Sequence, residues 1–249
     1  MSHRLQEKVA VITGASKGLG AAVAKRFGAE GASVVVNYAS SKGAADEVVN
    51  EIVKAGGNAI AIKANMSDPA EVEQLFAQAN QAYGRVDVLV NNAGVYDFQP
   101  IENLSLDFFR KHFELNVFGY LLAIKEAVKY MPEGSSIINM SSTVTLFGPE
   151  NASVYSATKG AIDGLTRALS NELAPRKIRV NAIKPGVVAT EGVQAGGFLD
   201  SEFGRETTAK TPLRRLGVPD DIAPAVVYLA SDESSWTTGE FMVLAGGHR

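Results

Sequence analysis

Short apolar runs alternate with longer amphipathic stretches along almost the whole chain. Residues 8–13 form the first run, which is apolar nearly throughout and ends at a glycine-rich turn, as a strand buried on both faces does. Together with six similar runs, it predicts strands at residues 8–13, 33–38, 59–63, 86–90, 136–140, 179–183 and 241–244.

The stretches between these runs carry apolar residues at helical spacing. They predict helices at residues 19–30, 42–55, 69–83, 106–130, 154–174 and 220–231. Strand, helix and strand repeated in this order form right-handed crossovers, which place the strands in one parallel sheet with helices on both faces. The pattern therefore predicts an α/β, doubly wound Rossmann fold with a parallel sheet of about seven strands.

No linker-like, repeated or low-complexity segment interrupts this pattern. We therefore expect residues 1–249 to form a single domain that both binds a dinucleotide and carries the catalytic groups. The least regular stretch is residues 191–215, which contains Gly192, Gly196, Gly197 and Gly204. A long glycine-containing connection beside a ligand site is typical of a lid, so we expect this stretch to close over the substrate.

Composition narrows the possible classes of protein. Of the 249 residues, 46% are hydrophobic and 20% are charged, as in an ordinary packed domain, and the net charge of −3 offers no basic surface for a nucleic acid. The sequence contains no cysteine, which excludes disulfides and thiolate catalysis. The polar first residues and the absence of a long apolar run predict a cytoplasmic protein without a membrane segment.

The three histidines are far apart in the sequence and lack the spacing of metal ligands. We interpret His3, His112 and His248 as surface or capping residues and expect no metal.

The first predicted strand leads into a turn with glycines at positions 14, 18 and 20. Glycine permits a tight turn and lets the backbone come close to a pyrophosphate, and the N-terminus of the following helix offers free N–H groups. The Gly-x-x-x-Gly-x-Gly turn, Gly14 to Gly20, therefore predicts a dinucleotide site.

The spacing of this turn resembles that of the short-chain dehydrogenase/reductase family. Further matches follow in the family's order: Asn91-Asn92-Ala93-Gly94, Asn116, Ser142, Tyr155 with Lys159, and Pro185-Gly186 with Thr190. The resemblance covers nearly the whole chain, and it is nearest to 3-oxoacyl-[acyl-carrier-protein] reductases and glucose dehydrogenase-like members. It implies an NADP(H)-dependent oxidoreductase that moves a hydride between the nicotinamide and a carbonyl or secondary alcohol.

The proton chemistry is expected from Tyr155. Tyr155 and Lys159 are four residues apart and share one face of a helix. A free phenol has a pKa near 10 and is a poor base, but a neighbouring ammonium and an oxidised nicotinamide both favour the phenolate. Tyr155 would give its proton to the forming alkoxide in reduction and take it back in oxidation.

The resemblance assigns three partners to Tyr155. Lys159 holds the nicotinamide ribose, Ser142 bonds the substrate oxygen, and Asn116 holds a water that relays protons through Lys159. The family's spacing selects Ser142 over Ser141, for which strand-end capping is the alternative. For Asn116 the alternative is a helix kink satisfied by its neighbours.

The resemblance also implies a set of cofactor contacts, in which Asn91 is the cofactor-facing member of its motif. The expected contacts are Gly14, Ser16, Lys17, Gly18, Leu19, Asn37, Tyr38, Ala39, Ser40, Asn65, Met66, Asn92, Ala93, Gly94, Tyr155, Lys159, Pro185, Gly186, Val188 and Thr190. Two positions depart from the family's pattern: Asn65 stands where Asp is frequent, and Ala245 precedes Gly246-Gly247 where Asp is frequent.

The end of the second predicted strand favours NADP(H) over NAD(H). An NAD site places a carboxylate there to bond the ribose 2′-hydroxyl, but the sequence has no acid between Glu30 and Asp46. Lys17 in the glycine loop can reach a 2′-phosphate, and Ser40 and Ser41 can add hydroxyl contacts unless they only cap the next helix.

The sequence gives weaker signals for the substrate and for the assembly of subunits than for the catalytic groups. Val144, Val187 and Phe198, with Thr143 and the lid, suggest a pocket for a moderately apolar ketone, 3-oxoacyl thioester or similar molecule. The helix that carries Tyr155 presents a stripe of small residues on its opposite face, which predicts a homotetramer, with burial under a loop of the same chain as the alternative. The stripe contains Ala157, Ala161, Gly164 and Ala168.

Two other functions remain possible on the same fold. A halohydrin dehalogenase-like protein lacks a dinucleotide site, and the glycines of the first turn argue against it. A non-catalytic binding or regulatory relative would not need the four residues Asn116, Ser142, Tyr155 and Lys159.

Overall fold

The computed structural model describes residues 3–195, 197 and 201–248, except for the side chains of residues 194, 195 and 203. Its centre is a parallel sheet of seven strands in the order β3-β2-β1-β4-β5-β6-β7. The strands are β1 (Val9–Ile12), β2 (Ser33–Tyr38), β3 (Asn58–Lys63), β4 (Val88–Asn91), β5 (Ser136–Met140), β6 (Arg179–Pro185) and β7 (Phe241–Leu244). The predicted Rossmann fold is confirmed.

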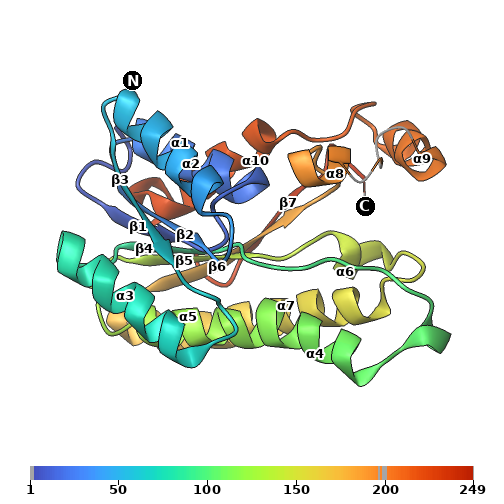
Figure 1. Cartoon of the computed structure of the whole chain (residues 1–249), viewed down its shortest axis with the longest axis horizontal. Helices are drawn as coiled ribbons and strands as arrows, with labels where there is room; N and C mark the ends of the chain where they lie inside the picture. The colour runs from blue at the N-terminus through green and yellow to red at the C-terminus, as the bar shows by residue number, and fades with distance from the viewer. Residues whose placement is uncertain (1–2, 196, 198–200, 249) are drawn as a thin grey trace.

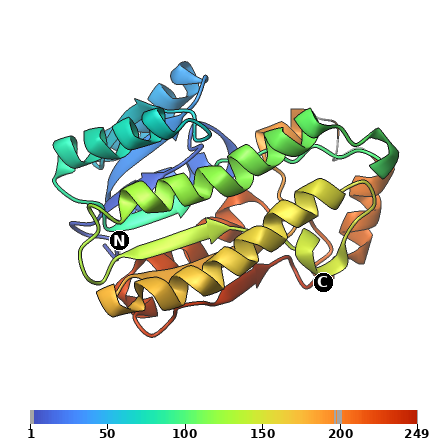
Figure 2. The ribbon, with the colours of Figure 1, turned by 90° about the horizontal axis from the view of Figure 1, so that it is seen from below.

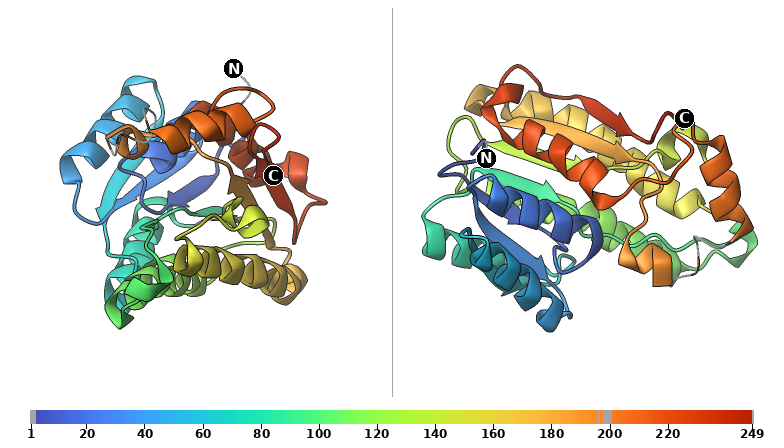
Figure 3. Two further views of the ribbon diagram at one scale, coloured as in Figure 1. Left: turned by 90° about the vertical axis from the view of Figure 1, so that its right-hand side faces the viewer. Right: turned by 90° about the horizontal axis from the view of Figure 1, so that it is seen from above.

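Helices cover both faces of the sheet (Figure 1). The first layer holds α1 (Gly18–Ala29), α2 (Lys42–Lys54) and α10 (Pro219–Ala230), with α1 between the other two (Figure 3). On the opposite face, α5 (Gly119–Ala127) lies between α3 (Pro69–Tyr83) and α7 (Ser153–Leu173) (Figure 2). Each layer buries its own apolar cluster against the sheet.

This division explains why the central strands read as unbroken apolar runs. In β1 the side chains of Ala10 and Ile12 join the cluster under α1, whereas Val11 joins the cluster under α3 and α5. Since successive side chains of a strand point to opposite faces, both sets must be apolar when both faces are covered.

The predicted helix at residues 106–130 is divided. It begins as α4 (Leu106–Phe113), continues as a π-turn (Glu114–Phe118) and resumes as α5. Asn116 lies in the π-turn, and its side chain bonds the backbone of Val95 in the loop after β4. The sequence pattern showed the apolar face of this segment but not the break in its hydrogen bonding.

The stretch at residues 191–215 is more regular than expected. Its described part contains α8 (Glu191–Ala195) and α9 (Glu202–Lys210), both beyond the carboxyl end of β6. A further short helix, α6 (Val144–Phe147), follows β5 and was not predicted. All three lie at one end of the molecule (Figure 1).

Parallel strands bring their carboxyl ends to one edge of the sheet. The glycine loop after β1, the Asn91 motif after β4, Ser142 after β5 and Pro185 at the end of β6 therefore meet at that edge. The order reverses between β1 and β4, and such a switch point is where open α/β sheets bind their ligands. In the described ranges, no helix combines the length and the apolar character that a membrane crossing needs.

Candidate active site

The glycine loop has the shape of a phosphate cradle. Gly14 and Gly18 have φ of 62° and 56°, a region that favours glycine. A Cβ on Gly14 would lie 2.9 Å from the Cα of Ala93, so a larger residue would push apart the turns after β1 and β4. Helix α1 begins at Gly18 without a side-chain cap, which leaves its first amides free to bind an anion. These features fit a dinucleotide pyrophosphate.

Asn37 supports this loop from below. Its side chain is buried, accepts a hydrogen bond from the N–H of Gly14 at 3.0 Å, and donates to the carbonyls of Ile62 and Ala64. Its polar atoms are therefore occupied within the protein. The expectation that the Asn37 side chain contacts the cofactor is at odds with these bonds, which make it a support of the loop.

The motif after β4 is also directed inward. Asn91 is fully buried and donates to Asn139 at 3.0 Å, so its side chain lies in the sheet and does not face the cofactor, contrary to expectation. Asn92 donates to the carbonyls of Thr13 and Gly14 at 2.9 and 3.0 Å. The exposed surface of the motif is therefore formed by the small residues that follow, Ala93 and Gly94.

The positions expected to meet the adenosine divide into two groups. Lys17, Ala39, Ser40 and Asn65 are exposed, as a ligand contact requires, whereas the side chains of Tyr38 and Met66 are buried in the core and leave only their backbone for contact. The remaining contacts in the loop, Ser16 and Leu19, are partly exposed.

The side chains of Asn65 and Ser41 show whether their polar groups are used within the protein or are open to the cofactor. The side-chain oxygen of Asn65 accepts from the N–H of Ser67 at 3.1 Å and so closes a local turn, although an oxygen can accept a second bond. The side chain of Ser41 makes no capping hydrogen bond to α2, so capping is not its role.

The segment after β6 returns toward the glycine loop. The N–H of Gly186 donates to Leu244 at 2.9 Å, and Val188 pairs with Gly217. Thr190 then comes close to Gly18: a Cβ added to Gly18 would lie 3.4 Å from the Cβ of Thr190. Pro185 to Thr190 thus run from the carboxyl edge of β6 to the start of α1, where the resemblance places the nicotinamide.

Ser142, Tyr155 and Lys159 come together as predicted. A side-chain hydrogen bond joins Ser142 to Tyr155. Lys159 is one helical turn further along α7, and its ammonium donates to the carbonyl of Met140 at 2.7 Å and lies 5.7 Å from the centre of the Tyr155 ring. The carbonyl thereby holds the lysine against the end of β5.

Burial sets the charge states of this pair. It raises the pKa of Tyr155 to about 12, and the hydrogen bond from Ser142 opposes the shift. Burial lowers the pKa of Lys159 to about 8, against the charge of Asp163. The phenol is therefore protonated at neutral pH, ready to act as an acid, and the buried lysine is close to its titration range.

Asn116 is fully engaged with protein groups. It is buried, its oxygen accepts from the N–H of Val95 at 2.8 Å, and its amide donates to the carbonyl of Val95 and to Thr158. This arrangement matches the alternative in which neighbours satisfy the side chain. A water relay at this position would have to use the backbone of the π-turn.

The structure separates the two serines after β5. The Ser141 hydroxyl is buried and donates to Asp163 at 2.7 Å, on the side of α7. Ser142 is partly exposed and receives the N–H of Val144. Only Ser142 is therefore open to a substrate oxygen.

The approach to Tyr155 is lined by aromatic residues that the sequence did not indicate. Phe98 meets the Tyr155 ring edge-on at 5.9 Å, and Tyr96 and Phe98 are about half exposed. Phe147 stacks near His248, with 5.1 Å between ring centres. For Tyr96 and Phe98 an unused signal was present, since two aromatic residues follow soon after Gly94 in a connection at the carboxyl edge of the sheet.

The predicted pocket residues are placed unequally. Thr143 and Val144 are buried, and the Thr143 hydroxyl donates to the carbonyl of Pro185. Of the next three residues, Thr145 is partly exposed, and Leu146 and Phe147 are exposed. Val187 lines a cavity of about 280 Å³ together with residues of α9 and the C-terminal segment. Phe198 lies outside the described residues.

The histidines are not all at the surface. His112 is fully buried, and its Nε2 accepts the N–H of Asp97 at 3.2 Å, which corrects its interpretation as a surface or capping residue. His248 is partly exposed.

Two charged residues near the site were missed. Asp163 lies one turn after Lys159 and is paired with Lys184 at 2.6 Å, and both are buried. The signal was present, since Lys184 is a charge within an apolar strand and Asp163 continues the four-residue spacing of Tyr155 and Lys159.

Known proteins resemble this chain over its full length. A family model described as enoyl-(acyl carrier protein) reductase matches residues 14–249. An uncharacterized oxidoreductase of Methylorubrum extorquens is 52% identical over 99% of both chains. Versicolorin reductase of Emericella nidulans is 39% identical over 99% of this chain and 97% of its own. Trihydroxynaphthalene reductase of Colletotrichum orbiculare is 37% identical over 98% and 90%.

Solved structures agree with these relatives. A short-chain dehydrogenase/reductase of Serratia marcescens has a TM-score of 0.94 at 37% identity and 99% coverage of each chain. A short-chain dehydrogenase of Burkholderia cenocepacia in complex with NADP has a TM-score of 0.93 at 33% identity, over 98% of this chain and 99% of the other.

Proposed function

The chain belongs to the short-chain dehydrogenase/reductase family, and on that basis we propose that it is an NADPH-dependent reductase of apolar, ring-containing ketones. Membership makes it an oxidoreductase that acts on carbonyl or alcohol groups with a nicotinamide cofactor. The cofactor, the direction and the substrate class are the parts proposed.

The residues have distinct parts in the reduction. The bound cofactor supplies the hydride. Tyr155 donates its phenolic proton to the substrate oxygen, Ser142 holds that oxygen by a hydrogen bond, and the ammonium of Lys159 stabilises the phenolate left behind. The observation that carries this assignment is geometric: the ammonium of Lys159 lies 5.7 Å from the centre of the Tyr155 ring, held there by the Met140 carbonyl at the end of β5, directly before the segment that carries Ser142.

The preference for NADP(H) rests on the rim of the cofactor site. Lys17 and Ser40 are exposed there, and no carboxylate lies between Glu30 and Asp46 to repel a 2′-phosphate. A relative of the same fold binds NADP. The residues expected to hold the cofactor, with Asn37 and Asn91 acting through the loops they support, are part of this proposal.

The aromatic approach supports a flat, apolar substrate. Tyr96 and Phe98 are exposed beside Tyr155, and aromatic side chains bind rings through their faces and edges. A relative named for trihydroxynaphthalene acts on a fused ring. Residues 191–215, with α8 and α9, form the proposed lid.

The assembly proposed is a homotetramer through α7. Ala157, Gly164 and Ala168 are exposed and Ala161 is partly exposed, so no loop of the described chain covers this stripe. The cytoplasmic location stays a prediction.

A substrate panel tests the proposal. Purified protein is assayed by the loss of NADPH absorbance with fused-ring ketones, simple ketones, a 3-oxoacyl thioester and a sugar. We expect the highest kcat/KM with the fused-ring ketones. A higher value with the thioester or the sugar would overturn the substrate class, and no turnover with any of them would overturn the reductase.

A further inference from the structure

The carboxyl end of β5 is bonded to one stripe of α7. The Met140 carbonyl accepts a hydrogen bond from Lys159 at 2.7 Å, and the Ser141 hydroxyl donates to Asp163 at 2.7 Å. The next residue along the strand is the catalytic serine, which bonds the catalytic tyrosine one turn earlier on the helix. Asp163 therefore extends the row of active-site contacts by one helical turn.

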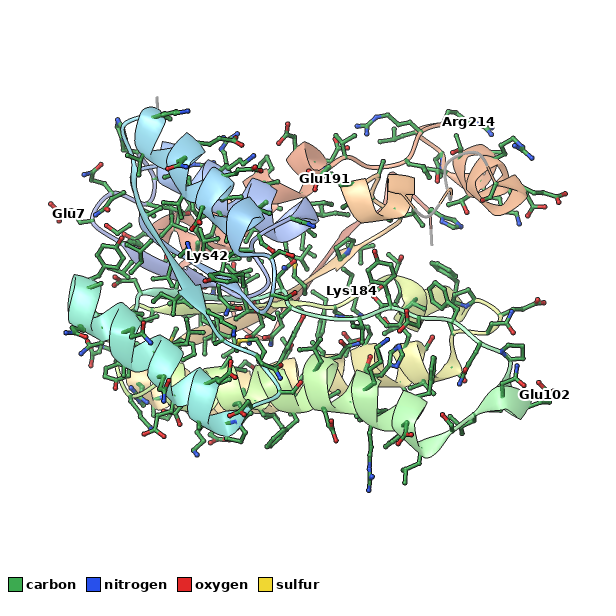
Figure 4. The ribbon with its side chains drawn as sticks, in the orientation of Figure 1. Glu7, Lys42, Glu102, Lys184, Glu191 and Arg214 are labelled. Carbon is green, nitrogen blue, oxygen red and sulfur yellow. The ribbon has the colours of Figure 1, made fainter. Side chains whose placement is uncertain are left out.

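Lys184 completes this row from the next strand. Its Nζ lies 2.6 Å from Asp163 and 3.0 Å from the Thr145 hydroxyl, and 4.8 Å from the centre of the Phe241 ring. Its side chain is 7% exposed, and it lies between the two helix layers (Figure 4). The pair thus joins α7, β6 and α6.

The pair holds both ends of the segment that carries Ser142. Asp163 accepts a hydrogen bond from Ser141, the residue directly before Ser142. Lys184 donates a hydrogen bond to Thr145, three residues after Ser142. A buried ion pair costs desolvation and is often no more stable than an apolar pair of similar volume. Stability alone is therefore a weak reason for its presence beside the active site.

The Asp163–Lys184 ion pair also affects the net charge around Lys159. Lys159 and Lys184 are positive and Asp163, between them, is negative. Lys159 faces the rings of Tyr155 on α7 and Tyr120 on α5, and Asp163 faces Lys184 on β6. Two further titratable groups lie one contact away: Tyr96 acts on Tyr155, and Arg167 shares the Phe241 ring with Lys184.

We infer that Asp163 and Lys184 are positioning residues, whose ion pair fixes the segment that carries Ser142 and balances the charge of Lys159. This inference rests on the proposed function for its kinetic consequences but not for its electrostatic ones. The charge of Asp163 already counters the effect of burial on the pKa of Lys159.

The two partners must act with opposite sign. Asp163→Asn removes the negative charge, so the pKa of Lys159 and that of Tyr155 both fall. Lys184→Met leaves Asp163 free to act on both groups, so both pKa values rise. A unit charge in a partly polar interior shifts a neighbouring pKa by about half a unit or more. The double variant removes both charges and returns the values toward those of the wild type.

The cofactor-free protein gives the first readout. The lysine side chains are labelled for NMR, the Lys159 signal is assigned with Lys159→Met, and its titration is followed in the wild type and the three variants. Lys177→Met is the matched control, because Lys177 pairs with Glu133 at 2.8 Å in an exposed ion pair beyond the amino end of β6. We expect opposite shifts of about half a pH unit or more, with none in the control.

The second readout is the pH profile of kcat/KM, which should move in the same directions, together with the loss of kcat from a misplaced Ser142. Shifts of equal sign, or no shift in folded variants, would overturn the inference and leave a purely structural pair. If a single variant does not fold, the double variant decides. A pKa of Lys159 in the double variant that differs from the wild-type value would contradict the inference that the charges of Asp163 and Lys184 offset one another. A wild type without reductase activity would overturn the proposed function and leave the NMR result standing.

Discussion

The side-chain oxygen of Asn37 accepts the N–H of Gly14 at 3.0 Å, so the end of β2 holds the first turn of the glycine loop in place. The same side chain bonds two carbonyls at the end of β3. The shape of the cofactor site thus depends on a residue that is itself closed to solvent.

Replacing Asn37 should weaken both the fold and cofactor binding. Asn37→Leu removes the side-chain partner of two buried carbonyls and of the partly buried N–H of Gly14, and one unsatisfied buried group costs about 1–3 kcal/mol. We expect a loss of about 2–4 kcal/mol in the free energy of unfolding by urea, with weaker NADPH binding by calorimetry. Asn58→Ala, at an exposed position, is the control. Unchanged stability in Asn37→Leu would contradict the role of the bond.

Tyr155→Phe should keep the fold and lose turnover. The ring contacts with Phe98 survive, but the proton donor is gone. General acid catalysis contributes about 10²- to 10⁴-fold, and kcat should fall by that factor with NADPH affinity retained. Tyr83→Phe, at the end of α3, where the hydroxyl donates to Asn58 in an exposed bond, is the control. A variant with more than half of the wild-type kcat would exclude Tyr155 as the acid.

Lys17→Ala should reduce the preference for NADPH. Hydrogen bonds to a charged group contribute about 1.5–3 kcal/mol, so the ratio of kcat/KM for NADPH and NADH should fall about ten- to a hundredfold. Lys25→Ala, on α1, where the lysine pairs with Glu51 of α2 at 2.7 Å, should leave the ratio unchanged. Equal wild-type values for the two cofactors would contradict the assignment of NADP(H). An unchanged ratio in Lys17→Ala would leave Ser40 and Ser41 as candidates.

Gly164→Glu should break the tetramer without unfolding the subunit. A Cβ at Gly164 meets nothing within 4 Å, so a larger side chain fits the isolated chain. Across a tight contact between helices it would place a charge in an apolar interface. Light scattering should show the wild type as a tetramer and the variant as a smaller species. Ala77→Glu, on the exposed face of α3, is the control. A monomeric wild type at micromolar concentration would refute the assembly.

The buried ammonium of Lys159 should leave a signature in the stability of the protein against pH. Its pKa is lowered to about 8 from 10.5, so between these values the unfolded chain binds a proton that the folded chain has released. The free energy of unfolding of the wild type therefore rises with pH across that window, and below it the full cost of the buried charge remains.

Lys159→Met lacks this cost. The variant should be more stable than the wild type at neutral pH, and the difference should shrink as the pH rises through the window. Urea unfolding at several pH values measures this difference, with Lys25→Met, at a partly exposed position, as control. A difference independent of pH would show that Lys159 does not titrate as inferred.

The order of elements was predictable because each strand of a covered parallel sheet is apolar on both faces. The residues proposed for catalysis were identified by their resemblance to a family pattern, and the four-residue spacing of Tyr155 and Lys159 placed these two on one face of a helix. The partners of polar side chains were not predictable. In the sequence, Asn37 and Asn91 cannot be distinguished from residues that bind a ligand. Only the neighbouring strands show that their side chains bond within the protein, Asn37 at the end of β3 and Asn91 at β5.

The same limit applies where distant segments meet. The aromatic approach joins Phe98 to Tyr155 and Phe147 to His248, pairs that no local pattern relates. The pair Asp163–Lys184 was visible as two charges in apolar surroundings, but its meaning required the register of β5 and β6. Helices α8 and α9 were missed because their glycines and polar residues mask helical spacing.

The π-turn at Glu114–Phe118 amounts to one residue inserted into an otherwise continuous helix, and its wider turn takes up that residue. Each residue of a regular helix turns the chain by about 100°. In a regular helix an extra residue would therefore rotate the buried side chains of α5, Leu122 and Ala123 among them, away from the core, and the π-turn prevents that rotation. The inserted residue thus leaves the core side of α5 intact, and what the π-turn adds is a position for Asn116, whose side chain bonds the loop after β4.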